Sequence, residues 1–409
     1  MTKIVKLKKI CSLIKRGITP KYTENDGIIV INQRCIRDGI ILYKNARKHD
    51  IVNKKIPEDK KIIAGDVLIN STGVGTLGRV SQIYPISEMT VDSHVTIVRA
   101  NPSDVDLAYF GYYLKLLQPS FEASGEGSTG QTELARERIG EHEIILPLKS
   151  EQVKIGKLLS NIDDLIQNNK IKNETFEEMA RVIFKSWFVD FDPVHAKAAG
   201  KAPMNMNAET AALFPNSFSD DGLPIGWSVK TLGDLILPKR GKTITKSKTK
   251  YGTIPVVAGG LEPAYYHNEA NVESPVITIS ASGANAGFTR LYYENIWASD
   301  CSYISKQQTD AIYFWFVFLE TNQRKIYHMQ QGAAQPHIYP SDLMRLELAV
   351  PNNKLIQHFE NLVTPYFQKI SIAQKESKTL TELRDTLLPK LMSGEIRVKD
   401  AEREVETAV

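Results

Sequence analysis

The residues that come closest to a known chemical motif are the glycines of Gly73–Gly78. They follow a strand-like apolar run and match the G-x-G-x-x-G spacing of a dinucleotide-binding turn. Such a site needs a helix to begin at the turn, because the helix N-terminus holds the pyrophosphate. Residues 79–85 instead predict a second strand that is closed by Pro85. We therefore interpret this segment as a tight hairpin or a DNA-facing loop.

Two further motifs fail for equally specific reasons. Gly241-Lys242-Thr243 resembles the end of a phosphate-binding loop, but Ile236 stands where that loop requires its first glycine. His195 follows Asp192-Pro193, but no second His, Cys or carboxylate stands at helical ligand spacing, so we expect no metal site. The sequence also contains no serine nucleophile elbow, no His-Glu-x-x-His and no Asn/Asp-Pro-Pro-aromatic signature. We therefore expect a non-catalytic protein with no cofactor of its own.

Composition and charge favour a two-domain protein that meets a polyanion. The 409 residues are too many for one ordinary domain, and 42% of them are hydrophobic, with no run long enough for a membrane span. Three widely spaced cysteines do not make a disulfide framework, so we expect a cytoplasmic protein without a membrane partner. Residues 1–100 hold 18 Lys and Arg against 9 Asp and Glu, and residues 226–260 hold seven against one. Two separate basic regions predict two contacts with a polyanion.

The chain repeats itself in order. Lys15-Arg16-Gly17 recurs as Lys239-Arg240-Gly241, and a strand-like run before Gly73 recurs before Gly283. Later matches share one offset of 204 residues, among them the prolines at 147 and 351 that close a strand. Each match is weak alone, but their preserved order indicates a tandem duplication.

Long amphipathic helices follow each copy. A mostly apolar seam with alternating spacings of three and four residues runs from Glu151, and adding 204 gives a second seam in the same register. A helix of this length needs a partner to bury its stripe, and the second copy supplies one if the two run antiparallel. The apolar seam positions are Ile155, Leu158, Ile162, Leu165, Phe176, Met179, Ile183, Phe359, Leu362, Tyr366, Leu380, Leu383 and Leu387.

The expected fold is therefore mixed α/β (α+β), with two globular domains and two long antiparallel coiled-coil helices related by a pseudo-twofold repeat. We place the first domain at 1–150, the first long helix at 151–190, a linker at 191–225, the second domain at 226–352, the second long helix at 353–392 and a tail at 393–409.

The loops of the two copies carry residue types that suit DNA. Lys and Arg contact phosphates, and Arg, Asn, Gln, Ser, Thr and His address base edges. The candidate DNA-binding residues are Lys15, Arg16, Thr19, Lys21, Asn70, Ser71, Thr72, Arg79, Gln131, Lys239, Arg240, Lys242, Lys246, Ser280, Asn285, Arg290, Gln335 and His337.

The chain resembles the specificity subunits of type I restriction–modification systems over nearly its whole length. The resemblance lies in Ser186-Trp187-Phe188-Val189-Asp190-Phe191-Asp192-Pro193-Val194, in Leu-Pro-Ile-Gly-Trp at 223–227, and above all in Leu-Arg-Asp-Thr-Leu-Leu-Pro-Lys-Leu-Met-Ser-Gly-Glu-Ile at 383–396. The loops around 262–267 depart from the family pattern.

The resemblance implies a subunit whose two target-recognition domains each read one half of a bipartite, asymmetric sequence in double-stranded DNA. It implies two modification (methyltransferase) subunits around the helices and restriction (endonuclease/translocase) subunits beside them. S-adenosylmethionine, ATP and Mg would serve those partners. Two alternatives remain open: the specificity half of a fused, type II-like methyltransferase, and a coiled-coil adaptor without DNA specificity.

Overall fold

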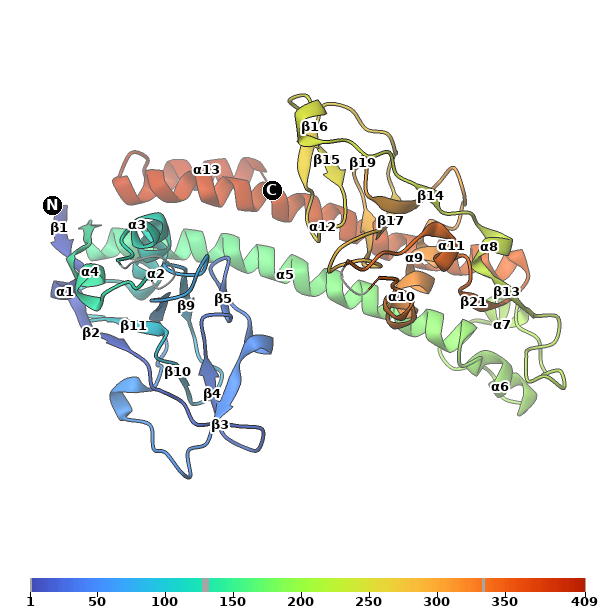
Figure 1. The fold of residues 1–409 in the computed structure, drawn as a ribbon, viewed down its shortest axis with the longest axis horizontal. Coiled ribbons are helices and arrows are strands. Elements are labelled where there is room, and N and C mark those ends of the chain that lie inside the picture. Colours follow the sequence, from blue (N-terminus) through green and yellow to red (C-terminus); the bar gives the residue numbers. More distant parts are fainter. Residues whose placement is uncertain (1, 127–131, 333–334, 409) are drawn as a thin grey trace. The chain divides into compact units, whose positions relative to one another are not determined.

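The computed structural model describes residues 2–126, 132–332 and 335–408. The chain divides into two compact units. Unit 1 contains the residues up to Asn168 and those from Lys375 onward, and unit 2 is Asn169–Gln374. Each unit therefore combines one globular part with half of each long helix (Figure 1).

The central sheet of unit 1 has four antiparallel strands in the order β2-β11-β8-β9. Strand β8 lies inside the sheet, and all five of its residues are buried, as expected for its apolar run. Strand β9 pairs with β8, so the glycines between them form a hairpin loop and not the start of a helix. The four strands are β2 (Cys11–Arg16), β8 (Asp66–Asn70), β9 (Val80–Ile83) and β11 (Val95–Ala100).

A second sheet of unit 1 has the order β10-β4-β7-β3, in which β4 and β10 are parallel and β4 and β7 antiparallel. Its strands are β3 (Tyr22–Thr23), β4 (Ile28–Ile31), β7 (Arg47–His49) and β10 (Met89–Val91). The other elements before the first long helix are β1 (Lys3–Lys6), α1 (Leu7–Ile10), β5 (Ile36–Arg37), β6 (Ile40–Ile41), η1 (Tyr43–Asn45), η2 (Glu58–Lys60), α2 (Leu107–Leu116), α3 (Gln118–Ala123), α4 (Arg136–Glu141) and β12 (Glu143–Leu146).

Unit 2 repeats this topology, which is the structural counterpart of the sequence duplication. Its central sheet has the order β14-β20-β17-β18, and its smaller sheet pairs β15 in parallel with β19 and antiparallel with β16. The elements are α6 (Asp192–Ala198), α7 (Ala208–Ala212), β13 (Ser228–Thr231), α8 (Leu232–Leu235), β14 (Lys239–Arg240), η3 (Lys246–Lys248), β15 (Ile254–Val257), β16 (Tyr265–His267), β17 (Val276–Ser280), β18 (Thr289–Tyr292), β19 (Trp297–Ala298), β20 (Cys301–Ser305), α9 (Ile312–Thr321), α10 (Gln323–His328), α11 (Pro340–Leu343) and β21 (Glu347–Val350).

The two long helices are α5 (Lys149–Phe188) and α12 (Asn353–Ser393), followed by α13 (Val398–Ala408). In unit 1, Arg384 of α12 donates to Asp163 of α5 at 2.6 Å. In unit 2, the ring of Phe176 stacks on Tyr366 at 5.7 Å, and Phe184 meets Phe359 edge to face. Later residues of α5 therefore meet earlier residues of α12, so the helices pair in antiparallel fashion within each unit.

The predicted seam holds in part and is displaced elsewhere. Ile155, Leu158, Ile162, Phe359, Leu380 and Leu387 are buried, and Phe176, Ile183, Tyr366 and Leu383 are partly buried against the cores. Leu165, Met179 and Leu362 are the corrections, because each is more than a third exposed. Elsewhere in unit 2 than at Phe359, fully buried residues lie one position after the predicted ones, at Ala180 and Phe184 in α5 and at Val363 and Phe367 in α12. In unit 2 the globular part also packs on α5, where Phe184 meets Phe314, so the buried stripe there is not set by the helix pair alone.

Two properties of the described residues bear on function. No helix there is both long enough and apolar enough to cross a membrane. Within the same residues, no group of three or more His, Cys, Asp or Glu side chains is arranged to hold a metal ion.

Candidate nucleic-acid interface

In unit 1, three segments with polar side chains emerge at one end of the central sheet. Arg16, the last residue of β2, pairs with Thr96 near the start of β11. Asn70, the last residue of β8, pairs with Val95, the first residue of β11. The segments after β2, after β8 and before β11 therefore leave the sheet together, and we call this region the loop end of the sheet.

Glycine 17 explains why the repeated motif reads Lys-Arg-Gly. A Cβ atom on Gly17 would lie 2.0 Å from the carbonyl oxygen of Val91. In unit 2, a Cβ atom on Gly241 would lie 2.3 Å from the carbonyl oxygen of Ser299. Only glycine allows the chain to pass so close to the neighbouring backbone, so the motif marks the same crossing in both units.

An arginine stands at this crossing in each unit, and a carboxylate fixes it. Arg16 forms an ion pair with Glu133 at 2.5 Å and donates to the carbonyl oxygen of Leu134. Arg240 forms an ion pair with Asp300 at 2.5 Å, and Asp300 also accepts the hydroxyl of Ser282. Each guanidinium is therefore held in a fixed direction at the loop end, which reduces the entropy lost when it contacts a ligand.

The hairpin loop of unit 1 is anchored from inside. The Asn70 side chain donates to the carbonyl oxygens of Gln33 and Thr76, both at 3.1 Å, and Ser71 shares a hydrogen bond with Thr96. Asn70 and Ser71 are fully buried, and Ser280, at the end of β17, is 4% exposed. These three residues correct our prediction, because a strand buried on both faces keeps even its last polar residues inside. Asn70 and Ser71 instead anchor the loop of unit 1 from inside.

Beyond that anchor the loop is exposed. Thr72 shares a hydrogen bond of 2.7 Å with Nδ1 of His94, the residue before β11. Gly73 and Gly75 have φ values of 107° and 69°, which places Val74 between two left-handed residues. Val74 is 85% exposed, so the tip of the loop carries an apolar side chain into solvent. Arg79, at the end of the loop, is partly exposed.

The remaining candidates of unit 1 are exposed and engaged with nearby groups. Lys15 forms an ion pair of 2.7 Å with Asp59, and this ammonium holds the pKa of that carboxyl below its usual range. Lys21 pairs with Asp50 at 3.6 Å. Thr19 is exposed, and its carbonyl oxygen accepts a hydrogen bond from Lys54. Gln131 lies outside the described residues.

In unit 2, the candidates fall into a basic segment and a set of loop residues. Lys239, Lys242 and Lys246 are exposed. Asn285 is partly exposed in the β17–β18 loop, where its carbonyl oxygen accepts from Phe288. Arg290 donates to the carbonyl oxygen of Leu261 and lies 4.9 Å from the centre of the Tyr292 ring.

Two candidates near the end of unit 2's globular part lie beside the same loop end. His337 forms an isolated bridge with Ser282, and its Nδ1 lies 2.8 Å from the carbonyl oxygen of Gln335. Gln335 itself is exposed. The structure therefore brings Arg240, Ser282, Asp300 and His337 together.

Sequence reasoning missed a pair of buried histidines that fix the basic loops. Nδ1 of His49 accepts the backbone N–H of Lys21 at 2.9 Å, and Nδ1 of His267 accepts the backbone N–H of Lys250 at 3.0 Å. His49 is fully buried and His267 is 5% exposed. Both stand at the end of an equivalent strand, β7 or β16, but their spacing from the Lys-Arg-Gly motif differs, so no constant offset marked them. Glu133 and Asp300, which pair with the two arginines, and His94, which pairs with Thr72, were also not among the candidates, because only the fold brings these partners together.

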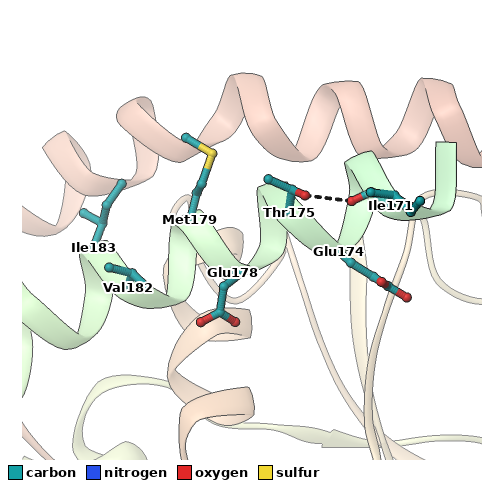
Figure 2. Close-up of a pocket in the computed structure, with 7 residues that line it drawn as sticks. All are labelled: Ile171, Glu174, Thr175, Glu178, Met179, Val182 and Ile183. Carbon is teal, nitrogen blue, oxygen red and sulfur yellow. Dashed lines mark hydrogen bonds between the residues drawn. The ribbon is translucent and has the colours of Figure 1, made fainter. Parts of the chain in front are cut away.

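A second surface lies on helix α5 in unit 2 and is apolar. A groove of about 520 Å³ runs along the helix from Ile171 to Ile183 (Figure 2). Ile171 and Val182 are 50% and 57% exposed, and Met179 also lines the groove. Glu174 and Glu178 border it, so the groove is an apolar strip with acidic side chains beside it.

The comparisons with known proteins agree on one family. Residues 2–178 and 224–382 match the model of the type I restriction modification DNA specificity domain. The chain is 28% identical to the type I restriction enzyme MjaIX specificity subunit of Methanocaldococcus jannaschii, over 73% of this chain and 71% of that protein. It is 26% identical to the type I restriction enzyme HindI specificity subunit of Haemophilus influenzae, over 94% of this chain and 98% of that protein.

A solved structure shares the fold. The type I restriction-modification S subunit from M. genitalium superposes with a TM-score of 0.58 and 19% identity, covering 96% of both chains. The family model covers both globular parts in tandem, and the similar proteins are specificity subunits, a non-catalytic kind of protein. The chain therefore belongs to the family of type I restriction–modification specificity subunits.

Proposed function

We propose that this protein reads DNA sequence for a type I restriction–modification complex and that each of its units reads one half of a bipartite, asymmetric target. The observation that carries the proposal is the loop end of the central sheet, which occurs twice with the same strand order and an arginine held by a carboxylate. The two copies differ in their exposed side chains, as two readers of different half-sites require.

The chemistry of the two loop ends fits this role. Arginine contacts guanine through two parallel hydrogen bonds, and a guanidinium that is already oriented loses little entropy on binding. Thr72 and His94 in unit 1 and His337 in unit 2 offer exposed hydrogen-bonding groups beside the arginines. Val74 offers an apolar contact of the kind that suits the methyl group of thymine. The exposed lysines contact phosphates and position the protein on the duplex.

The apolar groove on α5 supports a docking role for the long helices. We propose that a helix of a modification subunit lies in this groove, because an exposed strip of Ile171, Met179 and Val182 on one helix face suits the apolar face of another helix. Two modification subunits would then carry S-adenosylmethionine and methylate adenine, and restriction subunits would use ATP and Mg. Such a complex would act in the cytoplasm, where its DNA lies.

The test is to sequence modified bases in cells that express the modification subunit with and without this chain. We expect adenine methylation at one motif with two defined halves and an undefined spacer, and only when this chain is present. Methylation of the same motif without the chain, or of one continuous motif, would contradict the proposal.

A further inference from the structure

The segment Lys239–Tyr251 of unit 2, which we call the lysine segment, has an unusual distribution of charge. It contains Lys239, Arg240, Lys242, Lys246, Lys248 and Lys250, and no acidic residue occurs between Asp234 and Glu262. All five lysines are exposed. Among the described residues, none of their ammonium groups forms an ion pair or a side-chain hydrogen bond, whereas Arg240 pairs with Asp300.

The backbone of the lysine segment is nevertheless fixed. Lys242 donates its N–H to the carbonyl oxygen of Ala298 at 2.9 Å and accepts the indole N–H of Trp297 at 2.8 Å. Further along, the hydroxyl of Tyr265 donates to the carbonyl oxygen of Ile244, and the backbone N–H of Lys250 donates to Nδ1 of the buried His267. The segment therefore presents its free ammonium groups from an ordered backbone, so that little chain entropy is lost when they meet a ligand.

The equivalent segment of unit 1 is charged but neutralised. Lys15 pairs with Asp59, Arg16 with Glu133 and Lys21 with Asp50. Lys48, on the neighbouring strand β7, pairs with Asp26. Every basic residue from Lys15 to Lys21 thus has a carboxylate partner, whereas in the lysine segment only the arginine has one. The two loop ends share their fold but differ in free positive charge.

We propose that the lysine segment is a phosphate-binding element and that it supplies more of the salt-dependent affinity for DNA than its counterpart in unit 1. This inference rests on the proposed function and adds that the two units contribute unequally to phosphate binding. A free ammonium that meets a phosphate releases a condensed counterion, whereas one already paired with a carboxylate must first break that pair. Tyr251, which is fully exposed at the end of the segment, provides a hydroxyl of a type that also contacts phosphate.

The magnitude follows from counterion release. Each phosphate contact contributes about 0.9 to the slope of log K against log salt concentration on B-DNA. Loss of three contacts therefore lowers the slope by about 2.7. Between about 50 and 200 mM salt, the affinity of the wild type should then fall about 40-fold more than that of a variant without these contacts.

The experiment measures this slope for the full chain assembled with its modification subunits on a duplex that carries the target. The test variant is Lys246→Ala, Lys248→Ala, Lys250→Ala. The matched control is Lys15→Ala, Lys21→Ala, Lys48→Ala, which removes the same charge from ion-paired positions of unit 1. A third variant replaces the lysines at 246, 248 and 250 with arginine and keeps their charge.

We expect a slope lower by about two to three in the test variant, by less than one in the control, and unchanged in the arginine variant. Equal changes in the test variant and the control, or an unchanged slope in a test variant that still binds DNA, would overturn the inference and leave the proposed function intact. A wild-type complex without sequence-specific binding would instead overturn the proposed function.

Discussion

Glu320 gives the sharpest prediction about stability in unit 2. It lies in the last turn of α9, 3.6 Å from Arg181 of α5, which also pairs with Glu178 at 2.9 Å. Burial, together with the nearby carboxylate of Glu177, raises the pKa of Glu320 to about 7, while Arg181 opposes the shift. The folded protein therefore binds a proton at Glu320 over a pH range in which the unfolded chain does not.

The sign of the effect follows from proton linkage. Because the folded pKa lies above the unfolded value of about 4.5, the unfolding free energy falls as the pH rises from about 4.5 through about 7. A shift of this size corresponds to about 3.4 kcal/mol at 1.36 kcal/mol per pKa unit. The side chain is 27% exposed, and water relaxes part of this cost, so we expect about 1–3 kcal/mol.

The perturbation is Glu320→Gln, measured by urea unfolding at about pH 5 and about pH 8. Glutamine carries no charge at either pH. The unfolding free energy of the variant minus that of the wild type should therefore increase by about 1–3 kcal/mol from the lower to the higher pH. The control is Glu178→Gln, which removes a carboxylate beside the same Arg181 from a side chain that is 61% exposed. A difference for Glu320→Gln that is the same at both pH values, or matched by the control, would refute the reasoning.

Three further predictions follow from the helices and loops. Phe359→Ala should lower the unfolding free energy by about 3–5 kcal/mol in urea titrations, because this fully buried ring packs on Phe184 and Trp187. A loss below about 1 kcal/mol would contradict that packing. Asn70→Ala should lower the methylation rate of the target more than Thr19→Ala, because the Asn70 amide holds the β8–β9 loop whereas the Thr19 side chain is exposed. Equal methylation rates in the two variants would show that the loop does not need this anchor. The long helices connect the two units, and we expect their length to set the spacer between the half-sites. Insertion of one heptad into α5 and one into the facing stretch of α12 adds about 10 Å of helix, so methylation sequencing should report both half-sites intact and a spacer longer by about three base pairs. An unchanged spacer would contradict this role of the helices.

Much of the fold could be predicted from the sequence because the chain contains it twice. A repeat preserved in order specified two globular parts and two long helices, and both central sheets share one strand order. The strand after Gly78 was also predictable, because the residues there have no helical pattern. The structure confirms it as β9, which pairs with β8.

Only part of the predicted helix seam is buried in the structure. It holds at Ile155 and Ile162 in unit 1, but in unit 2 the buried residue is Ala180 and not the predicted Met179. A seam drawn for two helices alone cannot show this difference, because the globular part of unit 2 also packs against α5, as Phe314 does against Phe184.

The candidate interface was less predictable than the fold. Residue type alone predicted Asn70, Ser71 and Ser280 as DNA-binding residues, but these side chains are buried in the structure. The partners that fix the arginines come from distant segments, Glu133 being far from Arg16 along the chain, so no local spacing could indicate them. Which lysines remain free is likewise a property of the fold.

The most direct test of the account exchanges residues 1–150 for those of a relative with a different target and sequences the modified bases. We expect a hybrid motif in which one half-site changes, while the other half-site and the spacer stay as they were. A motif that changes in both halves would contradict the claim that each unit reads its own half of the target.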